Sequence, residues 1–300
     1  MSEPVLPLGA VYDEGVPAAE LPQREEQRNP VMIAAFEGWN DAGDAATSAI
    51  EQLELAWDAV PLTELDPEEF YDFQVSRPMA KLVDGVTRTI EWPTTRLSIC
   101  RPPDSPHDVI LVRGIEPNFR WRAFCAELVT IALDQQVAIV IGLGALLADV
   151  PHTRPVQVTG SAQDSETAER LGLTASRYEG PTGITGVFQD AFIQAGIPAV
   201  SFWAAVPHYV SQAPSPKATL ALLHRVEEAI DLEVPLGTLP AQAEEWETEV
   251  SQIASEDEEI STYIRTLEER DSSDEPLRPT SGESIAAEFE RYLRRRGPHS

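Results

Sequence analysis

Four short apolar runs, each close to a proline or glycine, constrain the fold of this chain more than any other feature. Their sequences are VMIAAF at 31–36, DVILVR at 108–113, VAIVIGL at 137–143 and PAVSFWAAV at 198–206. Short runs with little polar alternation are typical of strands that are buried on both faces of a sheet. The sequence therefore predicts a sheet with several central strands of this kind.

Segments with helical character separate and follow these runs, at 42–56, 119–135, 186–195 and 216–230. Shorter strands are expected at 87–92, 97–100 and 156–159, and a short helix at 165–171. Buried strands that alternate with amphipathic helices indicate an α/β fold with helices on both faces of the sheet. We expect a three-layer α/β/α domain with a mostly parallel central sheet at residues 30–235.

The remaining residues form two flanking regions. Residues 1–29 are rich in proline and glutamate, and we expect a surface segment there. Residues 236–300 are predicted to form an acidic C-terminal helical region, with a linker at 271–279 and a last helix at 284–296.

Within the C-terminal region, apolar residues recur at alternating spacings of four and three, with Asp257 in the one position that interrupts them. Such a narrow seam is typical of one helix packed on another. A helical hairpin or a contact between subunits would explain it, and we expect a homo-oligomer, a dimer or a trimer. The predicted contact residues are Trp246, Val250, Ile253, Ile260, Ile264 and Leu267.

Charge and composition narrow the class of protein. The chain has 50 acidic and 22 basic residues, a formal net charge of −28. Nucleic-acid and membrane-surface binding both require basic patches, so we expect neither, whereas an acidic surface suits a basic partner. No sorting signal and no membrane-spanning apolar run is recognisable. Cys100 and Cys125 are isolated, which indicates two buried thiols in a reducing cytoplasm.

Polar residues follow several of the predicted strands. Ligands of open α/β sheets bind beyond the carboxyl ends of the strands, so these residues form the predicted ligand- or partner-binding groove. The candidates are Trp39, Asn40, Asp41, Asp44, Arg113, Glu116, Arg154, Gly183 and His208.

Each candidate also has a structural alternative, which the sequence leaves open. Asn40 or Asp41 would equally serve as a helix N-cap. Arg113 and Glu116 would equally pair with each other. Arg154 and His208 would equally satisfy local hydrogen bonds, and Gly183 would equally belong to a glycine turn.

Recognisable catalytic motifs are missing from the sequence. The stretch from Gly142 to Leu147 begins like a dinucleotide-binding fingerprint but has Leu147 in place of the third glycine. There is no Gly-x-Ser-x-Gly elbow and no cluster of cysteine and histidine with metal-ligand spacing. We therefore assign no catalytic residue, no metal and no cofactor.

Taken in order, the polar loops resemble those of one known family. They are FEGWNDAG at 36–43, Glu116-Pro117 before Trp121, PHTRP at 151–155, YEGPTGI at 178–184 and PHY at 207–209. The set resembles the family named after the second proteasome assembly chaperone, and the acidic helical tail resembles its actinobacterial branch. The resemblance covers residues 30–235.

The resemblance implies a nucleoside phosphorylase-like α/β/α fold without enzymatic activity. It also implies a chaperone role on proteasome α subunits. Some members end in a hydrophobic-Tyr-X tail that docks into proteasome pockets, whereas this sequence ends in RGPHS at 296–300. We therefore do not expect docking through such a tail.

The leading hypothesis is a cytoplasmic, non-enzymatic, chaperone-like or scaffolding protein that binds a protein partner, for which the resemblance suggests proteasome subunits. The alternative is an enzyme on a phosphorylase- or hydrolase-like fold that acts on a small anionic or nucleoside-type substrate. It would bind an anion at the loop 180–186 and use His208 or Asp41 as a base. A third hypothesis is a regulatory subunit that senses a metabolite without turnover.

Overall fold

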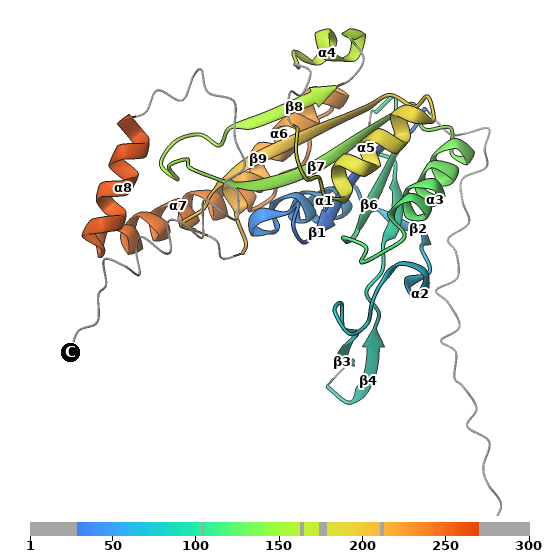
Figure 1. The fold of residues 1–300 in the computed structure, drawn as a ribbon, viewed down its shortest axis with the longest axis horizontal. Coiled ribbons are helices and arrows are strands. Elements are labelled where there is room, and N and C mark those ends of the chain that lie inside the picture. Colours follow the sequence, from blue (N-terminus) through green and yellow to red (C-terminus); the bar gives the residue numbers. More distant parts are fainter. Residues whose placement is uncertain are drawn as a thin grey trace, which may run out of the picture.

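The computed structural model describes residues 29–83, 85–103, 105–162, 165–173, 179–210 and 213–269. It is a mixed α/β structure built around a seven-stranded sheet (Figure 1). The predicted surface segment at 1–29, except Asn29, lies outside the described residues, as do the predicted linker at 271–279 and the predicted helix at 284–296. No helix in the described part of the chain is long and apolar enough to cross a membrane.

The four apolar runs form the centre of the sheet, as predicted. The strand order is β2-β5-β6-β1-β7-β9-β8. The central strands are parallel to one another: β6 (Val109–Ile115), β1 (Val31–Glu37), β7 (Ile139–Ala148) and β9 (Ala199–Pro207). The flanking strands are antiparallel to their neighbours: β2 (Val60–Glu64), β5 (Arg96–Cys100) and β8 (Val158–Ala162). The mostly parallel central sheet is therefore confirmed.

Helices cover both faces of the sheet, which confirms the three-layer arrangement (Figure 1). Helices α1 (Ala45–Ala56) and α6 (Pro216–Ile230) lie on one face, and α3 (Trp121–Asp134) and α5 (Ile184–Gln194) lie on the other. The short helices are η2 (Ala42–Asp44), α2 (Pro67–Phe70) and α4 (Ser165–Leu171). Successive strand residues point to opposite faces of the sheet. Along β1, Ile33 therefore packs in the core on the side of α1 and α6, and Met32 packs in the core on the side of α3 and α5.

Strand β7 is longer than the sequence indicated. We expected the strand to end at Leu143, but it continues to Ala148 and pairs with β9 along that length. The fingerprint-like glycines are therefore strand residues and not a loop. Gly144 faces the indole ring of Trp203, where a Cβ atom would lie 2.6 Å from Cε3. A glycine is needed there so that the ring can pack against the neighbouring strand.

A separate two-stranded hairpin projects from the domain (Figure 1). It consists of β3 (Met79–Val83) and β4 (Thr87–Glu91), which pair antiparallel only with each other. All residues of β3 are exposed, and Glu91 is the one β4 residue that is partly buried. We call this element the hairpin.

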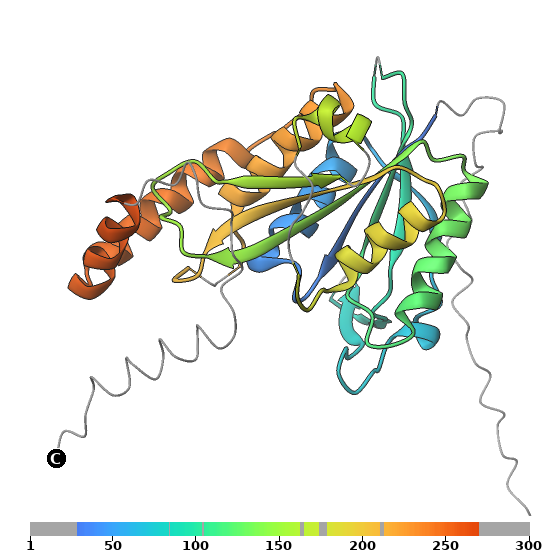
Figure 2. The ribbon, with the colours of Figure 1, turned by 45° about the horizontal axis from the view of Figure 1, so that its top comes forward.

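The C-terminal seam forms two helices, α7 (Leu239–Ser255) and α8 (Glu258–Glu269), which we call the arm. Helix α7 packs on α6, and the arm extends beyond the sheet (Figure 2). The break falls at Asp257, the residue that interrupts the apolar spacing. Its Oδ1 accepts hydrogen bonds from the N–H groups of Glu259 (2.9 Å) and Ile260 (3.2 Å) and so caps α8.

Much of the predicted seam is buried within this one chain. Val250, Ile264 and Leu267 are buried, whereas Ile260 is partly buried and Ile253 is 66% exposed. The predicted contact between subunits stays a prediction, with Ile253 as its most exposed member. The domain boundaries at 29/30 and 235/236 also stay predictions.

Candidate functional site

The turn after β1 presents one exposed tryptophan beside a buried amide. Gly38 has φ of +115°, a conformation that glycine adopts at little cost and that makes the sharp turn possible. Trp39 is 64% exposed, and Asn40 is 1% exposed. The carbonyl of Asn40 accepts a hydrogen bond from the N–H of Ala145 in β7 (2.8 Å). The turn is thereby fixed to the neighbouring strand.

Three of the predicted groove residues meet at this edge of the sheet. Glu116 follows β6, and its Oε1 accepts hydrogen bonds from Asn40 Nδ2 and from the N–H of Ile184, both 2.8 Å long. Gly183 packs against the same amide, because a Cβ atom there would lie 2.3 Å from Asn40 Oδ1. We call Asn40, Glu116, Gly183 and Ile184 the strand-end cluster. It connects β1, β6 and the start of α5.

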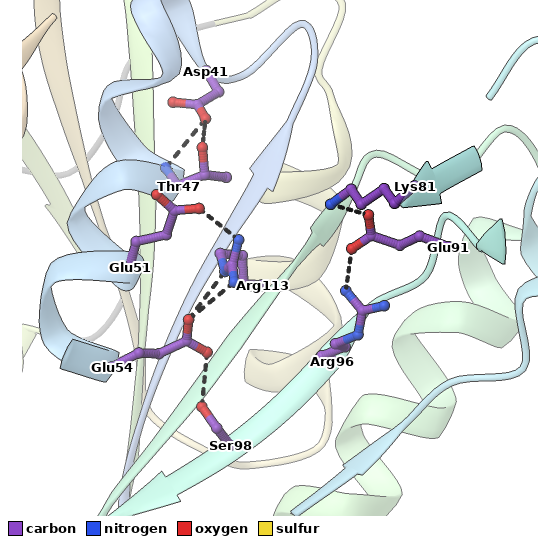
Figure 3. Close-up of polar contacts among 9 residues, drawn as sticks. All are labelled: Asp41, Thr47, Glu51, Glu54, Lys81, Glu91, Arg96, Ser98 and Arg113. Atoms are coloured by element: carbon purple, nitrogen blue, oxygen red, sulfur yellow. Dashed lines mark hydrogen bonds and ion pairs between the residues drawn. The ribbon is translucent and has the colours of Figure 1, made fainter. Parts of the chain in front are cut away.

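Asp41 faces α1. Its carboxylate accepts hydrogen bonds from the N–H groups of Ala46 (2.6 Å) and Thr47 (3.1 Å) and from the Thr47 hydroxyl (Figure 3). Burial raises the pKa of Asp41, although these hydrogen bonds oppose the shift. Because both carboxylate oxygens are engaged, the side chain acts in this structure as a cap of the helix.

The surface around Trp39 is acidic. Burial raises the pKa of Glu37, Arg113 opposes the shift, and the carboxylates of Asp44, Asp41 and Glu51 add to it. Asp44 is exposed at the start of α1. An exposed aromatic ring among carboxylates can contact an apolar side chain and a basic one at once.

Arg113 and Glu116 do not pair with each other. Arg113 forms ion pairs with Glu51 (2.7 Å) and Glu54 (3.1 Å) of α1, on the opposite face of the sheet from α5 (Figure 3). Glu54 also accepts a hydrogen bond from the hydroxyl of Ser98 (3.0 Å). Arg113 therefore connects β6 to α1 and lies outside the strand-end cluster.

Arg154 and His208 contact the arm. Arg154 donates a hydrogen bond to the carbonyl of Glu268 in α8. The Nδ1 atom of His208 lies 3.1 Å from a carboxylate oxygen of Asp149, which also accepts a hydrogen bond from Tyr263 of α8 (3.3 Å). The structure thus places the predicted groove residues in different parts of the domain. Asn40, Glu116 and Gly183 meet in the strand-end cluster, Asp41 and Arg113 contact α1, and Arg154 and His208 lie at a second site beneath the arm.

His152 is the centre of this second site. It is 3% exposed, and its ring nitrogens lie 2.9 Å from the hydroxyls of Tyr209 and Ser251. Burial lowers the pKa of His152; Lys217 adds to this shift, whereas Glu247 and Glu268 oppose it. Lys217 donates to the His152 carbonyl (2.6 Å) and forms an ion pair with Glu247. We call His152, Tyr209, Ser251, Lys217 and Glu247 the arm cluster.

A small cavity adjoins the arm cluster. His152, Arg154, Lys217 and Trp246 are among its lining residues, and its volume is about 20 Å³. That volume accommodates about one water molecule. The described residues contain no group of three or more histidine, cysteine, aspartate or glutamate side chains arranged to hold a metal ion.

The role of the arm cluster was not apparent from the sequence. His152 stood out there as a possible ligand for an anionic group within the PHTRP motif and not as a contact of the C-terminal helices, and Ser251 had no distinguishing pattern. The two residues are 99 positions apart, so no local spacing could have indicated their contact. Trp246, predicted as a contact between subunits, lines the cavity under the arm.

Comparison with known proteins places the chain among relatives of known structure. A sequence profile of the PAC2 family matches residues 35–254. A PAC2 family protein from Streptomyces avermitilis is 54% identical, over 78% of this chain and 99% of that one, with a TM-score of 0.74. No curated protein matches the chain.

Two further solved structures have names that describe a role. A proteasome-assembly chaperone homologue from Mycobacterium tuberculosis is 58% identical, over 78% of this chain and 99% of that one, with a TM-score of 0.72. PbaB of Pyrococcus furiosus, an archaeal proteasome activator, is 16% identical, over 76% and 94%, with a TM-score of 0.61. At that identity, the second likeness is one of fold alone.

Proposed function

Since the chain belongs to the PAC2 family, we propose that it is a non-enzymatic, chaperone-like or scaffolding protein that binds proteasome subunits. The chain self-associates through its arm, and it contacts its partner at the acidic loops around Trp39. The name of the mycobacterial relative, at 58% identity, supports the choice of partner.

Trp39 is the observation that carries the proposed binding surface. A large aromatic ring that is 64% exposed tends to associate with other surfaces, and tryptophan is enriched at the energetic centres of protein interfaces. The ring lies on a turn that Asn40 and Glu116 hold through buried hydrogen bonds. A fixed turn loses less conformational entropy on binding than a mobile one.

The enzymatic alternative has less support from the side chains that it requires. Both oxygens of Asp41 are engaged with α1. His208 lies against Asp149, Tyr209 and Tyr263 of the arm. The cavity at Arg154 accommodates about one water molecule and not a nucleoside. These residues are arranged for structural roles, which favours binding over turnover.

The test is a binding measurement between the full chain and purified proteasome subunits from the same organism. Trp39→Ala should weaken binding by about 30-fold, since a central aromatic contributes about 2 kcal/mol. Leu55→Ala is the matched control, because Leu55 is an even more exposed apolar residue on α1 (76%), and this substitution should leave the affinity unchanged.

Two outcomes would refute the proposal. One is the absence of binding to any proteasome subunit at low salt. The other is equal loss of affinity in both variants. Binding should also weaken as salt rises from about 50 mM to about 500 mM, because the proposed surface is charged.

A further inference from the structure

The hairpin exposes most of its apolar side chains to solvent. Its apolar side chains are between 46% and 84% exposed. They are Met79, Leu82, Val83, Val86 and Ile90, and Trp92 follows at 47% exposed. Leu82 and Ile90 lie on one face of the hairpin, and Met79 and Val83 lie on the other, because successive strand residues alternate. Two-stranded hairpins are marginally stable on their own, and exposed apolar residues that share a face commonly mark interfaces. This exposure favours the hairpin as a contact surface.

The base of the hairpin is held in place. Glu91 forms ion pairs with Lys81 of β3 and with Arg96 of β5 (Figure 3). The hydrogen bond from Lys81 is the main cause of the lowered pKa of Glu91. The rings of Phe73 and Trp92 pack with their centroids 4.9 Å apart. These contacts fix the direction in which the hairpin projects.

The free cationic groups near the hairpin indicate the charge of its partner. Arg77 and Arg88 are exposed, and neither has an acidic partner among the residues that the structure describes. In a chain with a net charge of −28, an apolar surface with unpaired arginines is unusual. It fits a surface that carries both carboxylates and an exposed apolar group.

The arm provides a surface of that kind. Ile253 is 66% exposed on α7, and Glu249 and Glu256 precede and follow it by four and three positions. Residues at those spacings lie on one face of a helix. Both glutamates are exposed, and neither forms an ion pair within the described residues.

We propose that the hairpin of one copy docks on the arm of a second copy. The face of the hairpin that carries Leu82, Arg88 and Ile90 covers Ile253. Arg77 and Arg88 face Glu249 and Glu256. Within one copy the two surfaces cannot meet, because the hairpin projects below the sheet while the arm extends from its side (Figure 1). The inference rests on the self-association in the proposed function and adds the surface that receives the arm.

The arrangement joins two different surfaces of the same chain. Such contacts close either as a reciprocal pair, in which each hairpin docks on the other arm, or as a ring. A reciprocal pair and a ring of three correspond to the dimer and the trimer that the sequence predicts.

The experiment reverses charge on each side of the contact in the full chain. One variant carries Arg77→Glu and Arg88→Glu, and the other carries Glu249→Arg and Glu256→Arg. For each variant alone, the dissociation constant of self-association should be at least about tenfold higher than that of the parent at about 50 mM salt, as measured by analytical ultracentrifugation. As a reciprocal pair, their equimolar mixture should associate again, because each hairpin then meets an arm of opposite charge. In a ring of three, one contact would still join like charges, so the mixture would recover only part of the parent's association.

Controls separate a lost contact from a lost fold. Arg122→Glu reverses an exposed arginine on α3 and should leave the mass unchanged. All variants should keep the parent's thermal midpoint measured at a dilution at which the parent is monomeric. A fourfold variant with all four reversals should associate like the parent, since attraction is restored on both sides.

The results that overturn the inference are distinct from those that overturn the proposed function. Suppose that the variant with Arg77→Glu and Arg88→Glu keeps the molecular mass of the parent's assembly, whereas deletion of residues 241–300 lowers it. The arm then binds a different surface of the second copy, and the inference fails. If the parent is a monomer at every concentration, both the inference and the proposed self-association fail, whereas proteasome binding is tested independently. If the hairpin variant keeps the mass of the parent's assembly but no longer binds proteasome subunits, the hairpin binds the proteasome and not a second copy, and the inference fails.

Discussion

Removal of the Glu116 carboxylate should separate the three loops of the strand-end cluster. In Glu116→Ala, Asn40 Nδ2 and the N–H of Ile184 lose their shared acceptor. Each buried donor without an acceptor costs about 1–3 kcal/mol. Loss of a negative charge at the start of α5 adds about 0.3–1 kcal/mol. We expect a total destabilisation of about 3 kcal/mol.

Glu116→Gln is the matched control. Both hydrogen bonds end at one oxygen, Oε1, so the amide oxygen of glutamine can accept both. Only the charge is lost, and the expected cost is about 1 kcal/mol or less. The contrast between the two variants isolates the hydrogen bonds from the electrostatic contribution.

Urea denaturation followed by circular dichroism measures the free energies of unfolding. For a domain of this size, about 3 kcal/mol corresponds to a fall of about 6–12 °C in the thermal midpoint. If the alanine and glutamine variants unfold within about 0.5 kcal/mol of each other, the reasoning is refuted. That result would mean that water satisfies the two donors and that the cluster does not hold the loops.

Three further predictions test the arm, the sheet and the thiols. The pKa of His152 is lowered in the folded state, so the unfolded chain binds more protons below about pH 6.5 and stability should fall on acidification. Thermal midpoints measured from about pH 7.5 to 5.5 should fall less steeply in His152→Gln, and identical slopes would contradict this. Gly144→Ala should cost about 1–3 kcal/mol because its Cβ meets the Trp203 ring, whereas Gly142→Ala, whose nearest contact is at 3.3 Å, should cost less in the same urea titration. Burial raises the thiol pKa values of Cys100 and Cys125 to about 12, so iodoacetamide should label neither before unfolding, as mass spectrometry would show.

The local pattern was sufficient for the central strands and for the family. VMIAAF and VAIVIGL lack polar positions, so each run had to be buried on both faces. The loop motifs that resembled the proteasome assembly chaperones are confirmed by the family match and by two solved relatives above 50% identity. The sequence showed Asp257 only as the interruption of the apolar spacing, and the structure shows that its carboxylate caps α8 there.

The predicted end of β7 was wrong, because the local sequence pattern does not include the contacts with neighbouring strands. The fingerprint-like pattern from Gly142 to Leu147 suggested a loop that follows a strand ending at Leu143. In the sheet, β9 supplies hydrogen-bond partners as far as Ala148, and the ring of Trp203 occupies the space that a side chain at 144 would need. The strand therefore continues through residues that a local pattern assigns to a turn.

The sequence by itself determined which segments are buried, because burial depends on local apolar character and on its period. Only the tertiary structure decided where the polar side chains find their partners. Glu116 binds an amide 76 residues away, Arg113 binds a glutamate 59 residues away, and His152 binds a serine 99 residues away. A buried polar group must find a hydrogen-bond partner, but the chain topology selects which one comes within reach.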